Sequence, residues 1–468
     1  LNSGFALPPR RITVNLAPAD IKKDGTAFDL PIALGILVAT GQLAGSSLAS
    51  CVAVGELGLD GAVRGTRGAL SVARRVAELA GATLILPPAN VVEASLVSGV
   101  RLVAPATLGG LVAALRGGPL ADARAAPAAP PSRDGGPDFA DVVGQGAAKR
   151  ALEVAAAGGH NVLLFGPPGA GKTMLARRLP GILPALGEAE ALEVTAVHSV
   201  AGLLPADRPL ITERPFRAPH HTVSDAGLIG GGTPPRPGEV SLAHRGVLFL
   251  DELLEFRRHV TESLRQPLED GRVVIARAGH TVVFPARFSL VAAMNPCPCG
   301  YAGDATRACY CPEGDVSRYR ARISGPVTDR IDMHVFVGSV PLRALSSGGS
   351  AERSASVRAR VEMARAAQRL RYARASPQWG SIAVNAHAPP RWLDASSALV
   401  PAARALLARA AERLALSARG YHRVLRVART IADLDEAETV AEVHVAEALR
   451  YRPAPGGASA GVASIVAR

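Results

Sequence analysis

The sequence has few aromatic residues, few lysines and few cysteines, and it lacks any long apolar run. Aromatic residues make up 4% of the 468 residues although apolar residues make up 48%, so the hydrophobic cores must consist of alanine, valine and leucine. No uninterrupted apolar run reaches 18 residues and no signal peptide is evident, so we expect a soluble, cytoplasmic protein without a membrane partner. A chain of this length is expected to form two or three domains.

Lysine is scarce although the chain is basic. Of its 52 basic residues only Lys22, Lys23, Lys149 and Lys172 are lysine, and the others are arginine. The formal net charge of +12 suits a polyanionic partner. The abundance of arginine, alanine and glycine also indicates a genome-wide composition bias, so charge alone does not identify that partner. In a chain with this bias, a position that is still lysine is a stronger candidate for a functional role.

Four of the five cysteines lie within fifteen residues, in the pattern C-x-C-x9-C-x-C. In a reducing cytoplasm such a cluster suggests a metal before it suggests disulfides. We expect four thiolates to close a tetrahedral Zn²⁺ site that braces this loop. The C-x-C spacing departs from the usual C-x2–4-C, and free buried thiols are the alternative. The cysteines are Cys297, Cys299, Cys309 and Cys311.

The order of strand-like and helix-like segments predicts an α/β protein in three parts. Residues 1–116 and 138–340 alternate strands with helices, and the longer stretch has the pattern of a parallel sheet covered by helices on both faces. Residues 117–137 form a Pro/Ala/Gly-rich linker, residues 341–451 an Arg/Ala-rich helical domain, and residues 452–468 a flexible tail. The chain enters strand-like sequence directly from Leu1, so we expect the native protein to begin upstream.

The stretch NVLLFGPPGAGKTMLARRL, residues 161–179, is an apolar strand, a GxxxxGKT turn and the start of an amphipathic helix. Such a turn wraps its backbone N–H groups around phosphates at a helix N-terminus. Lys172 would reach the β- and γ-phosphates of ATP, and Thr173 would ligate Mg²⁺. A structural glycine turn is the alternative, which the flanking strand and helix disfavour. The expected nucleotide-binding residues are Gly166, Pro167, Pro168, Gly169, Ala170, Gly171, Lys172 and Thr173.

Polar residues end two further strands. In GVLFLDEL, Asp251 is placed to hold Mg²⁺ through water, and Glu252 is placed to polarise the attacking water. A helix cap is the alternative for this acidic pair. Asn295 ends RFSLVAAMN and could orient the water from the other side.

Two arginines are candidates for contact with the transferring phosphoryl group. Arg330 suits an arginine finger offered to a neighbouring subunit's ATP, with a surface ion pair to Asp329 or Asp332 as the alternative. Arg426 could reach the γ-phosphate from the helical domain, with Arg423 and Arg429 as rivals one turn away.

Together these segments resemble AAA+ ATPases of the magnesium-chelatase-like group, specifically the ComM/YifB type. The resemblance runs from about Ile12 to Tyr451 and is carried by DVVGQGAAKRALEVAAAGGHNVLLFGPPGAGKT, PFRAPHHTVSDAGLIGGG, LRQPLEDGRVVIARAG, NPCPCG and SARGYHRVLRVARTIADL. It implies a homo-hexameric ring with ATP sites between subunits and DNA helicase activity promoting branch migration during natural transformation. It also places Lys172, Thr173, Asp251, Glu252, Asn295, Arg330 and Arg426 at the family's active-site positions.

The N-terminal domain resembles the proteolytic domain of Lon proteases without its catalytic dyad. The stretch DGTAFD has Ala27 where the family's serine lies, and Leu70 takes the place of its lysine. We therefore expect no peptidase activity, since no nucleophile remains to be activated. Lys22, Lys23, Arg10 and Arg11 form a small basic group that we expect to be a solvated face.

EDGRVVIARAGHTVVFPARFSLVAAMNP resembles the pore hairpin of MCM replicative helicases. The resemblance places Arg277 at a tip that contacts the DNA backbone, with His280 across the turn. A solvated arginine on an ordinary hairpin is the alternative. A second insertion, RPFRAPHHTVSDAGLIGGGTPPRPG, carries His220 and His221, which we expect to bond to the backbone of a turn rather than to a metal.

Three functions are compatible with these motifs. The first is a DNA-translocating ATPase. The second is a chelatase motor subunit driving Mg²⁺ insertion into a porphyrin, although the Lon-like domain and the cysteine cluster argue against it. The third is an ATP-gated scaffold, which the complete set of hydrolytic residues disfavours.

Overall fold

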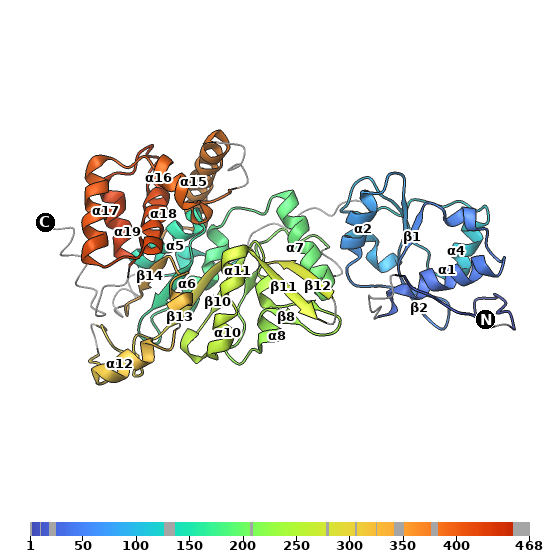
Figure 1. Cartoon of the computed structure of the whole chain (residues 1–468), viewed down its shortest axis with the longest axis horizontal. Helices are drawn as coiled ribbons and strands as arrows, with labels where there is room; N and C mark the ends of the chain where they lie inside the picture. Colours follow the sequence, from blue (N-terminus) through green and yellow to red (C-terminus); the bar gives the residue numbers. More distant parts are fainter. Residues whose placement is uncertain are drawn as a thin grey trace.

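The chain folds into three parts in sequence order. The computed structural model describes residues 2–9, 11–17, 25–125, 136–205, 209–277, 280–304, 307–323, 325–340, 351–375 and 382–452. They form an α/β structure with a small N-terminal parallel sheet, a central five-stranded parallel sheet and a C-terminal helical region, which confirms the predicted fold class. The N-terminal domain and the C-terminal helices lie at opposite ends of the molecule (Figure 1). No helix in the described ranges is long and apolar enough to cross a membrane.

The N-terminal domain is a three-stranded parallel sheet, in the order β1-β4-β5, with a short β2–β3 hairpin. Neighbouring residues on β4 point to opposite faces, so Leu84 and Ile85 join two separate apolar clusters. Beyond α4, the last helix of this domain, the backbone N–H of Ala123 donates to Leu102 O at 2.8 Å. The first part of the predicted linker therefore lies along β5. The elements are α1 (Asp29–Ala39), β1 (Cys51–Ala53), β2 (Glu56–Leu57), β3 (Val63–Arg64), α2 (Ala69–Ala77), β4 (Thr83–Ile85), α3 (Val91–Ala94), β5 (Arg101–Val103) and α4 (Leu108–Leu115).

The central sheet has the order β14-β6-β13-β10-β7, and its strands are parallel. Alternate side chains of β6 enter different cores: Val162 and Leu164 join one, Leu163 the other. Burial on both faces explains why these strands are almost continuously apolar. The strands are β6 (Val162–Phe165), β7 (Phe216–Arg217), β10 (Val247–Leu250), β13 (Ser289–Met294) and β14 (Met333–Phe336), and the longer helices beside them are α5 (Gly146–Gly158), α6 (Lys172–Ile182) and α7 (Glu188–Ala201).

Two insertions pack together beside this sheet. The antiparallel pair β11 (Arg272–Arg277) and β12 (His280–Pro285) forms the predicted hairpin, and Ala286 N donates to Gly271 O at 2.8 Å to close its root. Leu228 of the other insertion shares an apolar cluster with Ile275 and Phe284 of the hairpin. The remaining elements of this part are α8 (Asp225–Leu228), β8 (Gly230–Gly231), β9 (Arg236–Pro237), α9 (Glu239–Leu242), α10 (Arg258–Glu262), α11 (Arg265–Asp270), α12 (Glu313–Arg320) and α13 (Gly325–Thr328).

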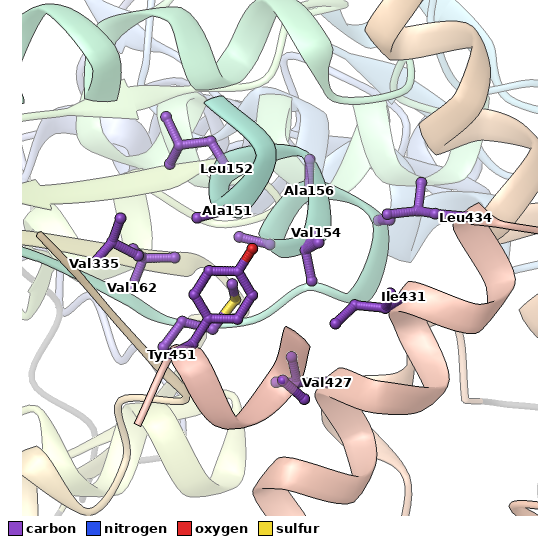
Figure 2. Close-up of a cluster of buried hydrophobic side chains, with 14 of the residues drawn as sticks. Ala151, Leu152, Val154, Ala156, Val162, Val335, Val427, Ile431, Leu434 and Tyr451 are labelled. Carbon is purple, nitrogen blue, oxygen red and sulfur yellow. The ribbon is translucent and has the colours of Figure 1, made fainter. Parts of the chain in front are cut away.

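The C-terminal helices share one apolar core with α5, α6 and one face of the central sheet. Val427 and Ile431 of α18 pack toward Val154 of α5, and Tyr451 fills the space beside Val162 and Val335 (Figure 2). Burying each such side chain contributes roughly 1.5–3 kcal/mol, so the helical region and α5 are held together as one packed unit. The helices are α15 (Ser354–Ala375), α16 (Pro390–Ser396), α17 (Pro401–Arg413), α18 (Ala418–Leu434) and α19 (Glu442–Arg450).

Helix α7 connects the N-terminal domain to the central part. Leu192 and Ala196 of α7 pack against the cluster that contains Leu70 of α2. One turn further on, Ser199 Oγ donates to the buried carboxylate of Glu93 at 2.8 Å. An apolar contact and a satisfied buried carboxylate therefore both join the two domains.

Candidate nucleotide-binding site and metal centre

The loop between β6 and α6 requires glycine at three of its positions. Gly169 and Gly171 have φ of 75° and 90°, where other residues are strained. A Cβ on Gly166 would lie 2.0 Å from the carbonyl oxygen of Val337, so no side chain fits there. Since α6 begins at Lys172, its free N–H groups open onto this loop, which is the geometry that binds phosphate.

The Lys172 ammonium lies inside the loop and contacts the end of a neighbouring strand. Its Nζ donates to the carbonyl oxygens of Gly166 and Pro167 at 2.6 and 3.0 Å and to Asn295 Oδ1 at 3.1 Å. Burial lowers the pKa of Lys172 from its ordinary value, whereas the carboxylates of Asp251 and Glu252 act in the opposite direction. A phosphate bound in the loop would therefore take the place of the two carbonyl oxygens that now accept from the Lys172 ammonium.

The hydroxyl of Thr173 is hydrogen-bonded to Asp251, the first residue of the acidic pair. Its Oγ1 donates to Asp251 Oδ2 at 2.6 Å, and the other carboxylate oxygen of Asp251 accepts from Glu252 N at 3.0 Å. A hydroxyl and a carboxylate in contact are oxygen ligands of the kind that Mg²⁺ prefers, so these residues fit the metal expected there. Strands β6, β10 and β13 are parallel, so their carboxyl ends bring Lys172, Asp251 and Asn295 to one edge of the sheet.

Gln145 contacts the glycine-rich loop, and the sequence patterns did not reveal this contact. It adopts φ 56° immediately before α5, and its Nε2 donates to Ala170 O at 3.0 Å and Gly338 O at 2.7 Å. It thereby joins the phosphate-binding loop to the end of β14. A polar residue just before a helix was the available signal, but its partners are distant in sequence.

The candidate arginines lie away from the glycine-rich loop and the acidic pair. Arg330, Arg423 and Arg426 line a cavity of about 590 Å³ whose walls also include the root of the β11–β12 hairpin. None of the described residues lining it belongs to the phosphate-binding loop or the acidic pair. Among the described residues, the arginine cavity and the glycine-rich loop with its acidic pair are therefore two separate places on one chain.

The three arginines of α18 differ in their surroundings. Arg429 is buried, pairs with Asp433 at 2.9 Å and donates to the carbonyls of Ala437 and Glu438, so it holds the helical fold. Arg426 donates through Nε and Nη2 to Ala388 O at 3.0 and 2.7 Å. Arg423 lies 4.0 Å from Asp329.

The remaining predicted residues lie on the β11–β12 hairpin and in the N-terminal domain. Arg277 and His280 pair across the hairpin turn, but their side chains lie outside the described part, as do residues 10 and 22–23 of the basic group. Ala27 lies in a short 3-10 helix and offers no hydroxyl, and Leu70 is completely buried against α7.

The four cysteines converge as one cluster. Their sulfur atoms all lie within 4.8 Å of one another. Cys297 Sγ is 3.3 Å from Cys299 Sγ and 3.6 Å from Cys309 Sγ, whereas the backbone N–H of Cys299 donates to Cys311 Sγ at 3.3 Å. Four thiolates around Zn²⁺ at about 2.3 Å would be roughly 3.8 Å apart, so the donor set and its spacing fit zinc.

A parallel sheet with a glycine-rich phosphate loop, an acidic strand end and an asparagine on the strand between them defines a P-loop nucleoside triphosphatase. Three family profiles cover most of the chain: "Subunit ChlI of Mg-chelatase" over residues 1–90, "Magnesium chelatase, subunit ChlI" over 138–345 and its C-terminal part over 351–452. The chain belongs to the magnesium chelatase ChlI family. Membership of this AAA-type family implies an ATPase that uses ATP and Mg²⁺.

Several relatives are similar over almost the whole chain. The competence protein ComM of Haemophilus influenzae is 45% identical over 97% of this chain and 87% of the relative. The YifB protein of Escherichia coli is 41% identical over 97% of this chain and 87% of the relative. The magnesium-chelatase 38 kDa subunit of Rhodobacter capsulatus is 31% identical over 34% of this chain and 50% of the relative. These matches confirm the predicted ComM/YifB resemblance.

Proposed function

We propose that this chain assembles into a hexameric ring that hydrolyses ATP at its subunit boundaries and moves along DNA, acting as a helicase in branch migration during natural transformation or recombination. The two separate halves of the site support assembly. The arginine cavity of one subunit would face the phosphate-binding loop of the next, and each ATP would contact both. The similarity to ComM, whose name is competence protein, supports a function on DNA.

In the proposed site each residue has a distinct role. Lys172 would bind the β- and γ-phosphates, and Thr173 and Asp251 would hold Mg²⁺, which neutralises phosphate charge when bound. Glu252 would accept a proton from a water whose oxygen attacks the γ-phosphorus, with Asn295 orienting that water. The bond from the γ-phosphorus to the bridging oxygen breaks and ADP leaves, while Arg330 of a neighbour, together with Arg423 or Arg426, stabilises the charge.

The observation that carries the proposal is the ion pair between Arg330 Nη2 and Glu269 Oε1. Glu269 is two residues from Gly271, which closes the root of the β11–β12 hairpin. A change in phosphate charge at the neighbour would alter this ion pair and thus move the hairpin. Its basic tip, with Arg277 and His280, would hold the DNA backbone without reading sequence.

The test is ATP hydrolysis by full-length protein with and without forked DNA. We expect DNA to stimulate the wild type, Glu252→Gln to abolish turnover, and Arg277→Ala to keep basal hydrolysis while losing stimulation. Arg272→Ala, at the exposed root of the same strand, is the matched control and should behave as wild type. A protein that stays monomeric with ATP and DNA contradicts the proposal.

A rate indifferent to DNA would favour one of two other functions. Family membership and the similarity to a magnesium-chelatase subunit support a motor for Mg²⁺ insertion into a porphyrin. The α2–α7 contact between domains would suit an ATP-gated scaffold.

A further inference from the structure

We propose that His221 is a positioning residue for ATP hydrolysis and holds the carboxylate of Glu252 in place for water activation. The inference rests on the ATPase part of the proposed function. It does not depend on DNA as the partner.

The first observation is the proximity of the two side chains. His221 Nδ1 lies 3.7 Å from Glu252 Oε2. This separation is longer than a hydrogen bond but within the reach of a small side-chain rotation or a bridging water. His221 comes from the insertion that follows β7, whereas Glu252 follows β10, so only the parallel arrangement of β7 and β10 brings them together.

The second observation concerns the backbone of Glu252. It has φ 51° and ψ 48°, the left-handed region that a residue with a Cβ rarely adopts. Such a conformation persists only where the surroundings hold it, and it is common at functional sites. Glu252 is 62% exposed, so packing does not fix its carboxylate, and a charged or polar neighbour is needed to orient it.

The third observation is that His221 itself is held. Its ring is one-third exposed and lies edge-on to Phe256, with ring centroids 6.4 Å apart, and Phe256 belongs to the apolar cluster beneath the hairpin. The ring of His220 also packs against the ring of His221, with centroids 4.1 Å apart and an interplanar angle of 34°. A ring fixed by packing with one nitrogen directed at a carboxylate is suited to orient that carboxylate.

The experiment compares three substitutions at His221 in the full chain. His221→Ala and His221→Phe should lower kcat at least tenfold while the Kd for a fluorescent ATP analogue stays within about twofold. Because phenylalanine keeps the packing on Phe256 and glutamine keeps a polar donor, His221→Gln should recover more activity than His221→Phe. His259→Ala removes another histidine of this region, paired with Asp225, and should leave kcat unchanged.

Three results would overturn the proposal. They are an unchanged kcat in His221→Ala, equal activity of the Phe and Gln variants, and loss of nucleotide binding in all three. If wild type hydrolyses ATP without responding to DNA, the DNA function fails while the comparison at His221 remains valid. The two proposals can therefore fail separately.

Discussion

The ammonium of Lys172 and the amide of Asn295 are in contact, with 3.1 Å between Nζ and Oδ1, although 123 residues separate them in the chain. This contact joins the loop that would bind phosphate to the strand end that would orient the attacking water. Replacing Lys172 should nevertheless affect nucleotide binding, whereas replacing Asn295 should affect the rate of hydrolysis.

Lys172→Ala should abolish nucleotide binding, because it removes the positive charge at the β- and γ-phosphates. Asn295→Ala should retain binding and lower kcat by about 10²-fold, the usual effect of losing one positioning group in a reaction site. Binding of a fluorescent ATP analogue and phosphate release measure the two effects. Loss of binding in both variants would contradict separate roles.

Mixed assemblies test whether the arginines act across a subunit boundary. Lys172→Ala and Arg330→Ala subunits should each be inactive alone, yet mixing them should restore part of the activity, because some boundaries then combine an intact loop with an intact arginine. Arg429→Ala serves as a contrast, since Arg429 bonds within its own helical region. Its loss should lower thermal stability. If mixtures stay inactive while ring formation persists, the arginine does not act in trans.

The cysteine cluster should bind one Zn²⁺ per chain. Replacing Cys297 and Cys309 with serine removes two of four thiolates, so zinc measured by mass spectrometry should fall to background. Cys51→Ser is the matched control, because Cys51 lies in the N-terminal domain far from the cluster in sequence. One zinc retained by the double variant would exclude this site.

Acid should destabilise the fold through His244. Its Nδ1 accepts from Arg287 N at 3.0 Å, and burial, with Arg245 and Arg287 nearby, lowers its pKa from 6.5 to about 4, against the effect of Glu193. Between these pH values the unfolded chain binds a proton that the folded chain does not. The free energy of unfolding therefore decreases as pH falls, by about 1.4 kcal/mol from this residue at pH 5.5.

The measurement is urea unfolding at pH 7.5 and 5.5 for wild type and His244→Gln. The variant should lose less stability than wild type over this interval, because it has no imidazole to protonate. Equal losses in the two proteins would show that His244 titrates normally in the folded state.

Local sequence was sufficient for the fold class and for the conformation of the glycine-rich loop between β6 and α6. One short segment contains the strand, the glycines that adopt positive φ and Lys172. Because these residues are consecutive in the chain, a local pattern was enough to predict the loop. The apolar runs at 162–165, 247–250 and 289–294 likewise predicted buried parallel strands. The cysteine spacing brought four thiols together because only nine residues separate the two pairs.

Tertiary structure alone decided which distant side chains meet. The sequence favoured Arg426, with Arg423 and Arg429 as rivals one turn away. Only packing shows that Arg429 belongs to the helical core, whereas Arg423 and Arg426 line the cavity beside the hairpin root. No local pattern predicted that Gln145 would contact the loop between β6 and α6 or that His221 would lie beside Glu252. The reason is physical: strand order and crossovers set these neighbours, and neither is encoded in the spacing of residues along a single segment.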